Sequence, residues 1–447
     1  MNNKPAQRRL PHVAGAIATA VTLCTGSGAV AGIDGITGPT FNLTAKADYI
    51  NSGDGNFHYM WSFANGNGRM QYPGPTMIVN QGETVTVTLN NELAVPVSLI
   101  FPGQSGVESP GCAATTGSST GSGKQGAIAC EAAAKVPPAV RSTDTVTYTF
   151  KASKPGTYMY QSGTNPALQV EMGLVGALIV RPAVENPLGQ AYEHPATAFH
   201  REHLFVLTEI DPAIHFYMEF GVQPNLALRR STLFFINGRN APDTMLDSGS
   251  PWLPTQPYGS VARMHPGEKL LMRVVAAGQE LHPLHHHGNN TWTIARDGRL
   301  LESTPGAGPD LAWSDFTIKS IPGQTVDAIY QWTGKNLGFD FYGHAPGDPL
   351  QPGECPNGIG APDCDHGKPL PVALPNLADL TIGAHYSGSP YLGQFGTLPP
   401  GTTTQNLHAG YYHMVHSHTE LELTNDGLFP GGMAAMIIVE HPGVPIP

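Results

Sequence analysis

Short runs of apolar and β-branched residues, separated by glycine and proline, recur along most of the chain. Runs of about four to eight such residues are typical of β-strands and are shorter than most helices. The 53 glycines and 41 prolines supply frequent turns between them. The pattern predicts an all-β protein, and 447 residues suffice for two β-sandwiches of ordinary size. The strand-like runs are residues 76–79, 84–89, 145–150, 175–180, 204–207, 232–236, 269–275, 325–332 and 436–439.

These runs form two similar sets, which indicates an internal repeat. The segment Asn80-Gln-Gly-Glu-Thr-Val-Thr-Val resembles His265-Pro-Gly-Glu-Lys-Leu-Leu-Met in the second half of the chain. Each half also closes with an apolar run that ends at a proline, Pro182 or Pro442. We therefore predict sister domains at residues 32–190 and 191–447. The segment from about residue 335 to 407 is rich in glycine and proline, and it is predicted to be an insertion in the second domain.

The first 31 residues have the pattern of an export signal. Lys4, Arg8 and Arg9 precede an uncharged segment at residues 13–23, and Ala29-Val30-Ala31 provides a small-residue cleavage site. This segment is shorter than the roughly 20 apolar residues that a membrane span requires. The sequence predicts a secreted or periplasmic protein with no membrane span.

Charge and cysteine content narrow the function classes further. Removal of residues 1–31 leaves 20 basic and 34 acidic residues, a net charge of −14, which disfavours nucleic acid as a partner. The four remaining cysteines lie in two local pairs, Cys112 with Cys130 and Cys355 with Cys364. An even count in an exported chain favours disulfides, and metal ligation by thiolates is the alternative.

Two histidine-rich segments are the main candidates for chemistry. They are His282-Pro-Leu-His285-His-His287-Gly288 and His413-Met-Val-His416-Ser-His418. Because residues two apart share one face of a strand, His285 with His287 and His416 with His418 are expected to form two facing pairs. Four convergent imidazoles predict a metal site, although a solvated histidine-rich loop is the alternative. Imidazole suits copper, zinc, iron and nickel, so the residue type alone leaves the metal open.

The first segment resembles the His-Pro-x-His-x-His-Gly motif of multicopper oxidases. The resemblance implies copper as cofactor, with His282 at a type 1 site, His285 at a type 2 site and His287 at a type 3 site. The segments at residues 72–76, 173–180 and 235–239 also resemble framework sequences of this family. The fold implied is two cupredoxin-like Greek-key β-sandwich domains, the second with the long insertion.

The second segment departs from the family pattern. His416-Ser417-His418, leading to Gly432-Met433, resembles the family's His-Cys-His motif, but Ser417 stands at the cysteine and Glu422 at the histidine that follows. A blue copper centre needs a cysteine thiolate, so we predict no normal type 1 site. Glu420 and Glu422 are expected to continue the strand of His416 and to be partners of the imidazoles, an extra oxygen ligand or solvent-facing carboxylates.

The first domain is predicted to lack copper ligands. Alignment of the two halves places residues without imidazoles at the positions of the histidines. Opposite His282, His285 and His287 lie Val97, Ile100 and Pro102, and opposite His416 lies Gln161.

Three functions remain open from the sequence. The first is an exported copper-binding oxidoreductase of the multicopper-oxidase type with a reduced imidazole site, acting on a small phenolic or metal-ion substrate. Its expected metal ligands are His282, His285, His287, His416 and His418. The others are a non-catalytic copper-binding or copper-handling protein and a structural, metal-stabilised β-sandwich protein. Two-domain members of the family often form trimers, which implies a homo-oligomer here. His344, within the insertion, is expected to be a surface histidine, with an approach to the metal as the alternative.

Overall fold

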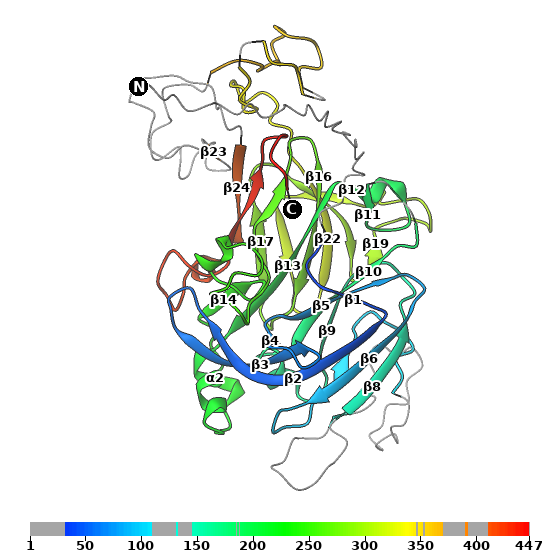
Figure 1. The fold of residues 1–447 in the computed structure, drawn as a ribbon, viewed down its shortest axis with the longest axis vertical. Helices are drawn as coiled ribbons and strands as arrows, with labels where there is room; N and C mark the ends of the chain where they lie inside the picture. The colour runs from blue at the N-terminus through cyan, green and yellow to red at the C-terminus, as the bar shows by residue number, and fades with distance from the viewer. Residues whose placement is uncertain are drawn as a thin grey trace, which may run out of the picture.

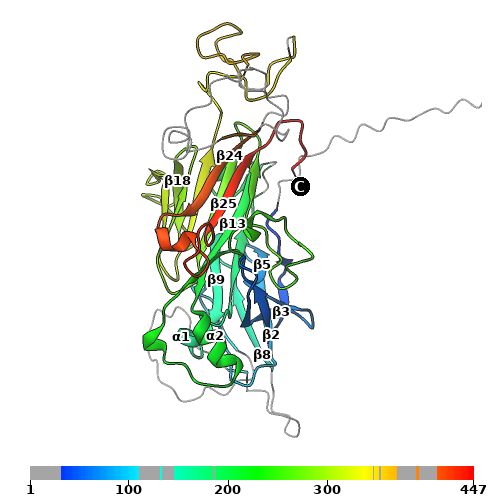
Figure 2. The same ribbon diagram turned by 90° about the vertical axis from the view of Figure 1, so that its left-hand side faces the viewer.

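The computed structural model describes residues 32–109, 131–132, 145–369 except 185, 187, 346, 352 and 353, the backbone of 389–391, and 410–446. The predicted export signal and the Cys112–Cys130 pair lie outside these residues. Strands dominate, and the all-β prediction is confirmed. Figures 1 and 2 show an elongated molecule with the first half at one end and the second half at the other.

The strands of the first half form two sheets packed face to face. One sheet has the order β1 (Ile36–Thr37), β5 (Gly74–Asn80), β10 (Val175–Arg181), β9 (Gly156–Ser162) and β7 (Leu99–Ile100). The other has the order β4 (Met70–Gln71), β3 (Phe57–Asn65), β2 (Thr40–Asn51), β6 (Thr84–Asn91) and β8 (Thr145–Lys151). In β6 the apolar side chains alternate inward, so Val85, Val87 and Leu89 lie in the core.

The second half repeats this layered arrangement. One sheet has the order β14 (Leu233–Ile236), β13 (Arg201–Ile210), β16 (Lys269–Ala276), β22 (Thr325–Gln331), β18 (Thr291–Arg296) and β19 (Arg299–Leu300), with β20 (Trp313–Asp315) on β18. The other has the order β15 (Ala262–Met264), β25 (Ala434–Val439), β24 (Gly410–Ser417), β17 (His282–His286) and β21 (Thr317–Ser320), with β23 (Ser389–Tyr391) on β24. Asp297 and Gly298 form the tight turn between β18 and β19, both with positive φ.

Short elements complete the described chain. Strands β11 (Gly189–Gln190) and β12 (Ala198–Phe199) pair with each other. Helix α2 (Pro212–Glu219) begins where Asp211 accepts a hydrogen bond from the N–H of Ala213, with proline in the first turn. The other short helices are α1 (Pro166–Gln169), η1 (Pro195–Thr197), η2 (Leu226–Leu228), η3 (Asp243–Met245) and η5 (Glu420–Leu423). No helix among the described residues is long and apolar enough to cross a membrane.

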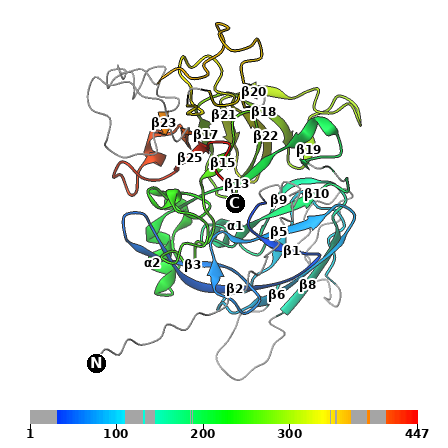
Figure 3. The same ribbon diagram turned by 45° about the horizontal axis from the view of Figure 1, so that its top comes forward.

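Buried side chains join the two halves into one body. Met159, Val175 and Ile179 of the first half pack against Val206 and Val275 of the second, and Figure 3 shows β9 and β10 beside β13. A polar network lies next to this apolar contact, because buried Arg273 on β16 pairs with Glu202 and also contacts Thr157 of β9. The halves therefore meet through both apolar packing and a buried charge that is paired with a carboxylate.

Three sequence predictions concern the insertion and the segment after β24. The described residues from 335 to 369 contain neither helix nor strand, and the predicted disulfide between Cys355 and Cys364 is present. The prediction that His344 is a surface histidine is wrong, since it is 4% exposed. The expectation that Glu420 and Glu422 continue the strand of His416 is also wrong, because the strand ends at Ser417 and η5 follows.

Candidate metal centre

Strands β17 and β24 place the histidines of the two motifs side by side. The strands are antiparallel neighbours, and their register sets His285 directly opposite His416. Side chains directly opposite each other on such strands project from the same face. The imidazole centroids of these two residues are 5.3 Å apart. The register of β17 and β24 therefore brings together the two motifs that the sequence indicated.

Three imidazoles converge closely enough to share one ion. One ring nitrogen from each of His285, His287 and His416 lies within 4.8 Å of the other two. The Nε2 atoms of His287 and His416 are 3.2 Å apart, and the ring centroids of His285 and His287 are 4.9 Å apart. Imidazole nitrogens at this spacing are suited to a transition-metal ion.

The fourth predicted imidazole is close to this group but outside it. The ring centroid of exposed His418 is 4.9 Å from that of His285 and 5.7 Å from that of His416. It follows the last residue of β24, and its N–H still donates to the carbonyl of Pro283 on β17 at 2.9 Å. Its role as a ligand stays a prediction.

Neighbouring groups orient the ligand nitrogens. Nδ1 of His416 donates to the backbone carbonyl of Ser417 at 2.7 Å, which leaves Nε2 directed at the group of three. Nδ1 of His285 lies 3.0 Å from the hydroxyl of Thr317 on β21. A hydrogen bond on the other ring nitrogen is the usual device by which proteins fix a ligating histidine.

The electrostatics of the group favour neutral imidazoles. Burial, together with repulsion from His287, His416 and His418, lowers the pKa of His285 to about 4. Burial also lowers the pKa of His416 to about 4. Both are unprotonated at neutral pH, and a metal ion binds the unprotonated form.

His282 occupies a different environment at the other end of β17. Its Nε2 lies 2.9 Å from a carboxylate oxygen of Glu209, and its Nδ1 lies 2.9 Å from Glu422. The hydroxyl of Ser417 donates to the same Glu422 oxygen at 2.5 Å. Burial alone would lower the pKa of His282, but the two carboxylates raise it to about 9. The structure thus brings together His282, Ser417 and Glu422, the three positions that the family resemblance assigns to a type 1 site.

Sequence reasoning missed the residues that complete this second environment. Glu209 lies on β13, 73 positions before His282, and also pairs with Arg229 at 2.6 Å. The same guanidinium binds Glu171 and Glu280, at 2.5 and 2.8 Å. An acidic residue within the apolar run 204–210 was the available signal, because a charge in a buried strand needs a partner.

The first half has the matching backbone without the ligands. Strands β7 and β9 pair Ile100 with Gln161, as β17 and β24 pair His285 with His416. The residues that sequence alignment set opposite the two histidines are therefore register partners themselves. Neither side chain offers an imidazole.

Known proteins resemble this chain in fold. No family model matches it, and no curated protein sequence matches it significantly. Among solved structures, the multicopper oxidase mgLAC matches with 18% identity and a TM-score of 0.53, over 91% of this chain and 87% of its own. The blue copper oxidase from Nitrosomonas europaea matches with 18% identity and a TM-score of 0.53, over 89% of this chain and 85% of its own. The chain therefore has the cupredoxin-type fold of the multicopper oxidases.

Proposed function

We propose that this protein is an exported copper-binding oxidoreductase with a reduced, all-imidazole copper site and no type 1 thiolate. The observation that carries the proposal is the convergence of His285, His287 and His416 on one point, with the pKa values of His285 and His416 lowered to about 4. His418, whose ring lies beside His285, is the fourth imidazole available to the ion. We expect one or at most two copper ions per chain.

The donor set fits copper. All three converging donors are nitrogens, which copper accepts, and the surrounding fold is the one used by known copper oxidases. Copper held there would supply one-electron redox chemistry and leave coordination positions for a small substrate. The carbonyl of Ser417 and the hydroxyl of Thr317 would keep the imidazoles in place during that exchange.

The surroundings of the three imidazoles favour a small aromatic molecule as the electron-donating substrate. Phe316 is 56% exposed, and its ring centroid is 5.6 Å from that of His285. An exposed aromatic ring beside a ligand gives a phenolic molecule an apolar surface to stack against. Because position 417 has no cysteine thiolate to pass electrons to the imidazole site, the electron-donating substrate has to reach that site directly. A phenol or an easily oxidised metal ion meets this requirement.

A specific observation favours a second candidate, a non-catalytic copper-binding or copper-handling protein. The position of the type 1 site contains the His282, Glu209 and Glu422 cluster, which is suited to charge pairing rather than electron transfer. A protein that only stores or delivers copper needs imidazole ligands but no relay. Oxidation of a phenolic donor by the copper-loaded protein separates the two candidates.

Copper titration of matched variants tests the proposal. His416→Ala removes a ligand, and we expect it to lower copper affinity on the order of 100-fold or more, since changes in outer-shell partners alone cost roughly 10- to 100-fold. His286→Gln is the control, because His286 lies between the ligands in sequence but its Nε2 contacts Thr291. Elemental analysis should find one or two coppers per chain, without an intense blue absorption band. Equal affinity in both variants, or an intense blue band, would contradict the proposal.

A further inference from the structure

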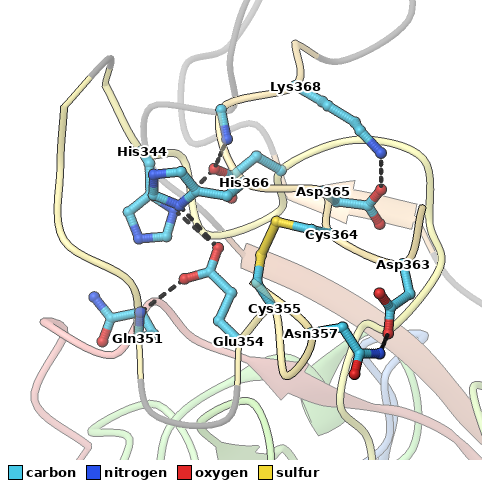
Figure 4. The surroundings of a disulfide bond; sticks show 12 residues. His344, Gln351, Glu354, Cys355, Asn357, Asp363, Cys364, Asp365, His366 and Lys368 are labelled. Carbon is cyan, nitrogen blue, oxygen red and sulfur yellow. Dashed lines mark hydrogen bonds and ion pairs between the residues drawn. A yellow bond between two sulfur atoms is a disulfide. The ribbon is translucent and has the colours of Figure 1, made fainter. Parts of the chain in front are cut away.

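Four side chains of the insertion form a second group, separate from the three imidazoles of β17 and β24. Asp340, His344, Glu354 and His366 each direct one ligand atom into a group whose members lie within 4.8 Å of one another. Nδ1 of His344 lies 2.8 Å from Asp340 and 3.5 Å from Glu354, and Nδ1 of His366 lies 3.0 Å from Glu354. Figure 4 shows the two imidazoles close together beside the Glu354 carboxylate, near the Cys355–Cys364 disulfide, and their ring centroids are 4.3 Å apart.

All four side chains are shielded from solvent. The side chains of Asp340, His344, Glu354 and His366 are 1%, 4%, 7% and 9% exposed. Backbone N–H groups fix the carboxylates, since Tyr342 and Gly367 donate to Asp340, at 2.9 and 2.6 Å. The N–H of Gln351 donates to the second oxygen of Glu354 at 2.7 Å. The oxygens that face the histidines are thus held in position before any ligand arrives.

The cluster has more negative charge than its neighbours balance. Among the described residues, the ion-pair partners of Asp340 and Glu354 are only the two histidines. The nearby Lys368 pairs with Asp365, and Lys335 pairs with Asp363. The buried Nε2 of His344 has no hydrogen-bond partner among the described residues. Two buried carboxylates whose only ion-pair partners among the described residues are imidazoles provide a site for a cation.

We infer that Asp340, His344, Glu354 and His366 bind a structural zinc ion. Zinc takes four nitrogen, oxygen or sulfur ligands at about 2.0–2.2 Å in a tetrahedron, which sets neighbouring ligand atoms about 3.4 Å apart. Three of the separations, 2.8, 3.0 and 3.5 Å, lie close to that value, and all four ligand atoms lie within 4.8 Å of one another. Four protein ligands would close the coordination sphere, as in structural rather than catalytic zinc sites.

Such an ion would order the insertion on the second sandwich. Asp340 lies between Phe339 and Phe341, which belong to the buried core of that sandwich, and the ring of Phe341 lies 5.0 Å from that of Trp332. His366 and Glu354 flank the disulfide in sequence. The ion would therefore connect the disulfide-closed loop to residues anchored in the core. Figure 1 places this part of the chain at the end of the molecule farthest from the first half.

Zinc titration in a His416→Ala background tests the inference, because this change removes a ligand of the first group and weakens metal binding there. We expect one zinc per chain in this background and loss of that zinc in Glu354→Gln and His366→Gln. Asp363→Asn is the control, since Asp363 is an acidic residue of the same loop that pairs with Asn357 outside the cluster. Retention of zinc by the Glu354 and His366 variants, or no zinc in the background protein, would overturn the inference.

X-ray absorption on the zinc-loaded His416→Ala chain, whose insertion is unsubstituted, provides a test that does not depend on the folding of the insertion variants. The spectrum should show zinc bound by nitrogen and oxygen alone. Sulfur ligands would mean that the cysteines bind the ion instead and would overturn the assignment. Zinc should also raise the melting temperature of the His416→Ala protein, and the control variant should keep that rise.

Discussion

The two ends of strand β17 place the same residue type in opposite electrostatic environments. His282 lies between the carboxylates of Glu209 and Glu422, which raise its pKa to about 9. Three residues later, His285 is half-buried among other imidazoles, and its pKa is lowered to about 4. The motif supplies histidines, but their partners decide the function of each one. One end is suited to an ion pair and the other to metal binding.

Removal of one carboxylate at the charged end should give the largest effect on stability. Glu422→Gln leaves a buried imidazolium with a single carboxylate, and loss of one partner of a buried pair costs about 3–5 kcal/mol. We expect the free energy of unfolding to fall by that amount at pH 7, measured by denaturant titration. Glu420→Gln is the matched control, since Glu420 is exposed in the same 3-10 turn. A similar small loss in both variants would mean that Glu422 does not stabilise His282.

The pH dependence of the free energy of unfolding should report the contribution of protonated His282 to the same contact. The pKa of His282 is about 9 in the folded protein and ordinarily about 6.5 in an unfolded chain. Its stabilising contribution is therefore fully present below about pH 6.5 and is lost as the pH rises through about 9. This contribution to the free energy of unfolding is about 3 kcal/mol. Unfolding of the wild type and His282→Gln from pH 6 to pH 10 measures it, and parallel curves would contradict it.

Copper affinity at the metal-binding end of β17 should change least with pH. Because the pKa values of His285 and His416 are about 4, protons do not compete with copper at neutral pH. We expect copper affinity, measured by chelator competition, to change by less than about twofold between pH 6 and pH 8 and to fall below about pH 5. Imidazoles with an ordinary pKa of about 6.5 would lose affinity already between pH 7 and pH 6. Such an early loss would show that the imidazoles are not held neutral.

Local pattern predicted the parts of the molecule that local geometry determines. The two-residue spacing of His285 and His287, and the position of His416, depend on strand pleating, and the structure brings these three together. The Cys355–Cys364 disulfide closes a short loop and was equally accessible from sequence.

Contacts between distant segments could not be predicted in this way. Glu209 reaches His282 only because β13 and β17 lie in facing sheets of one sandwich. His344 is buried because Glu354 and His366 fold back over it, and no periodicity in a loop rich in glycine and proline encodes that. Glu422 lies in a 3-10 turn, since the chain leaves the sheet directly after Ser417.

The direct register pairing of His285 with His416 has a consequence for how such centres arise. Their proximity comes from the spacing of about 5 Å between neighbouring strands, not from the shape of a loop. Inserting or deleting one residue within either strand would turn the side chains to the opposite face of the sheet. A lineage therefore gains or loses this centre by single substitutions at fixed positions. Ile100 and Gln161 occupy the same register in the first half, so two substitutions there would place a second imidazole pair on an existing scaffold.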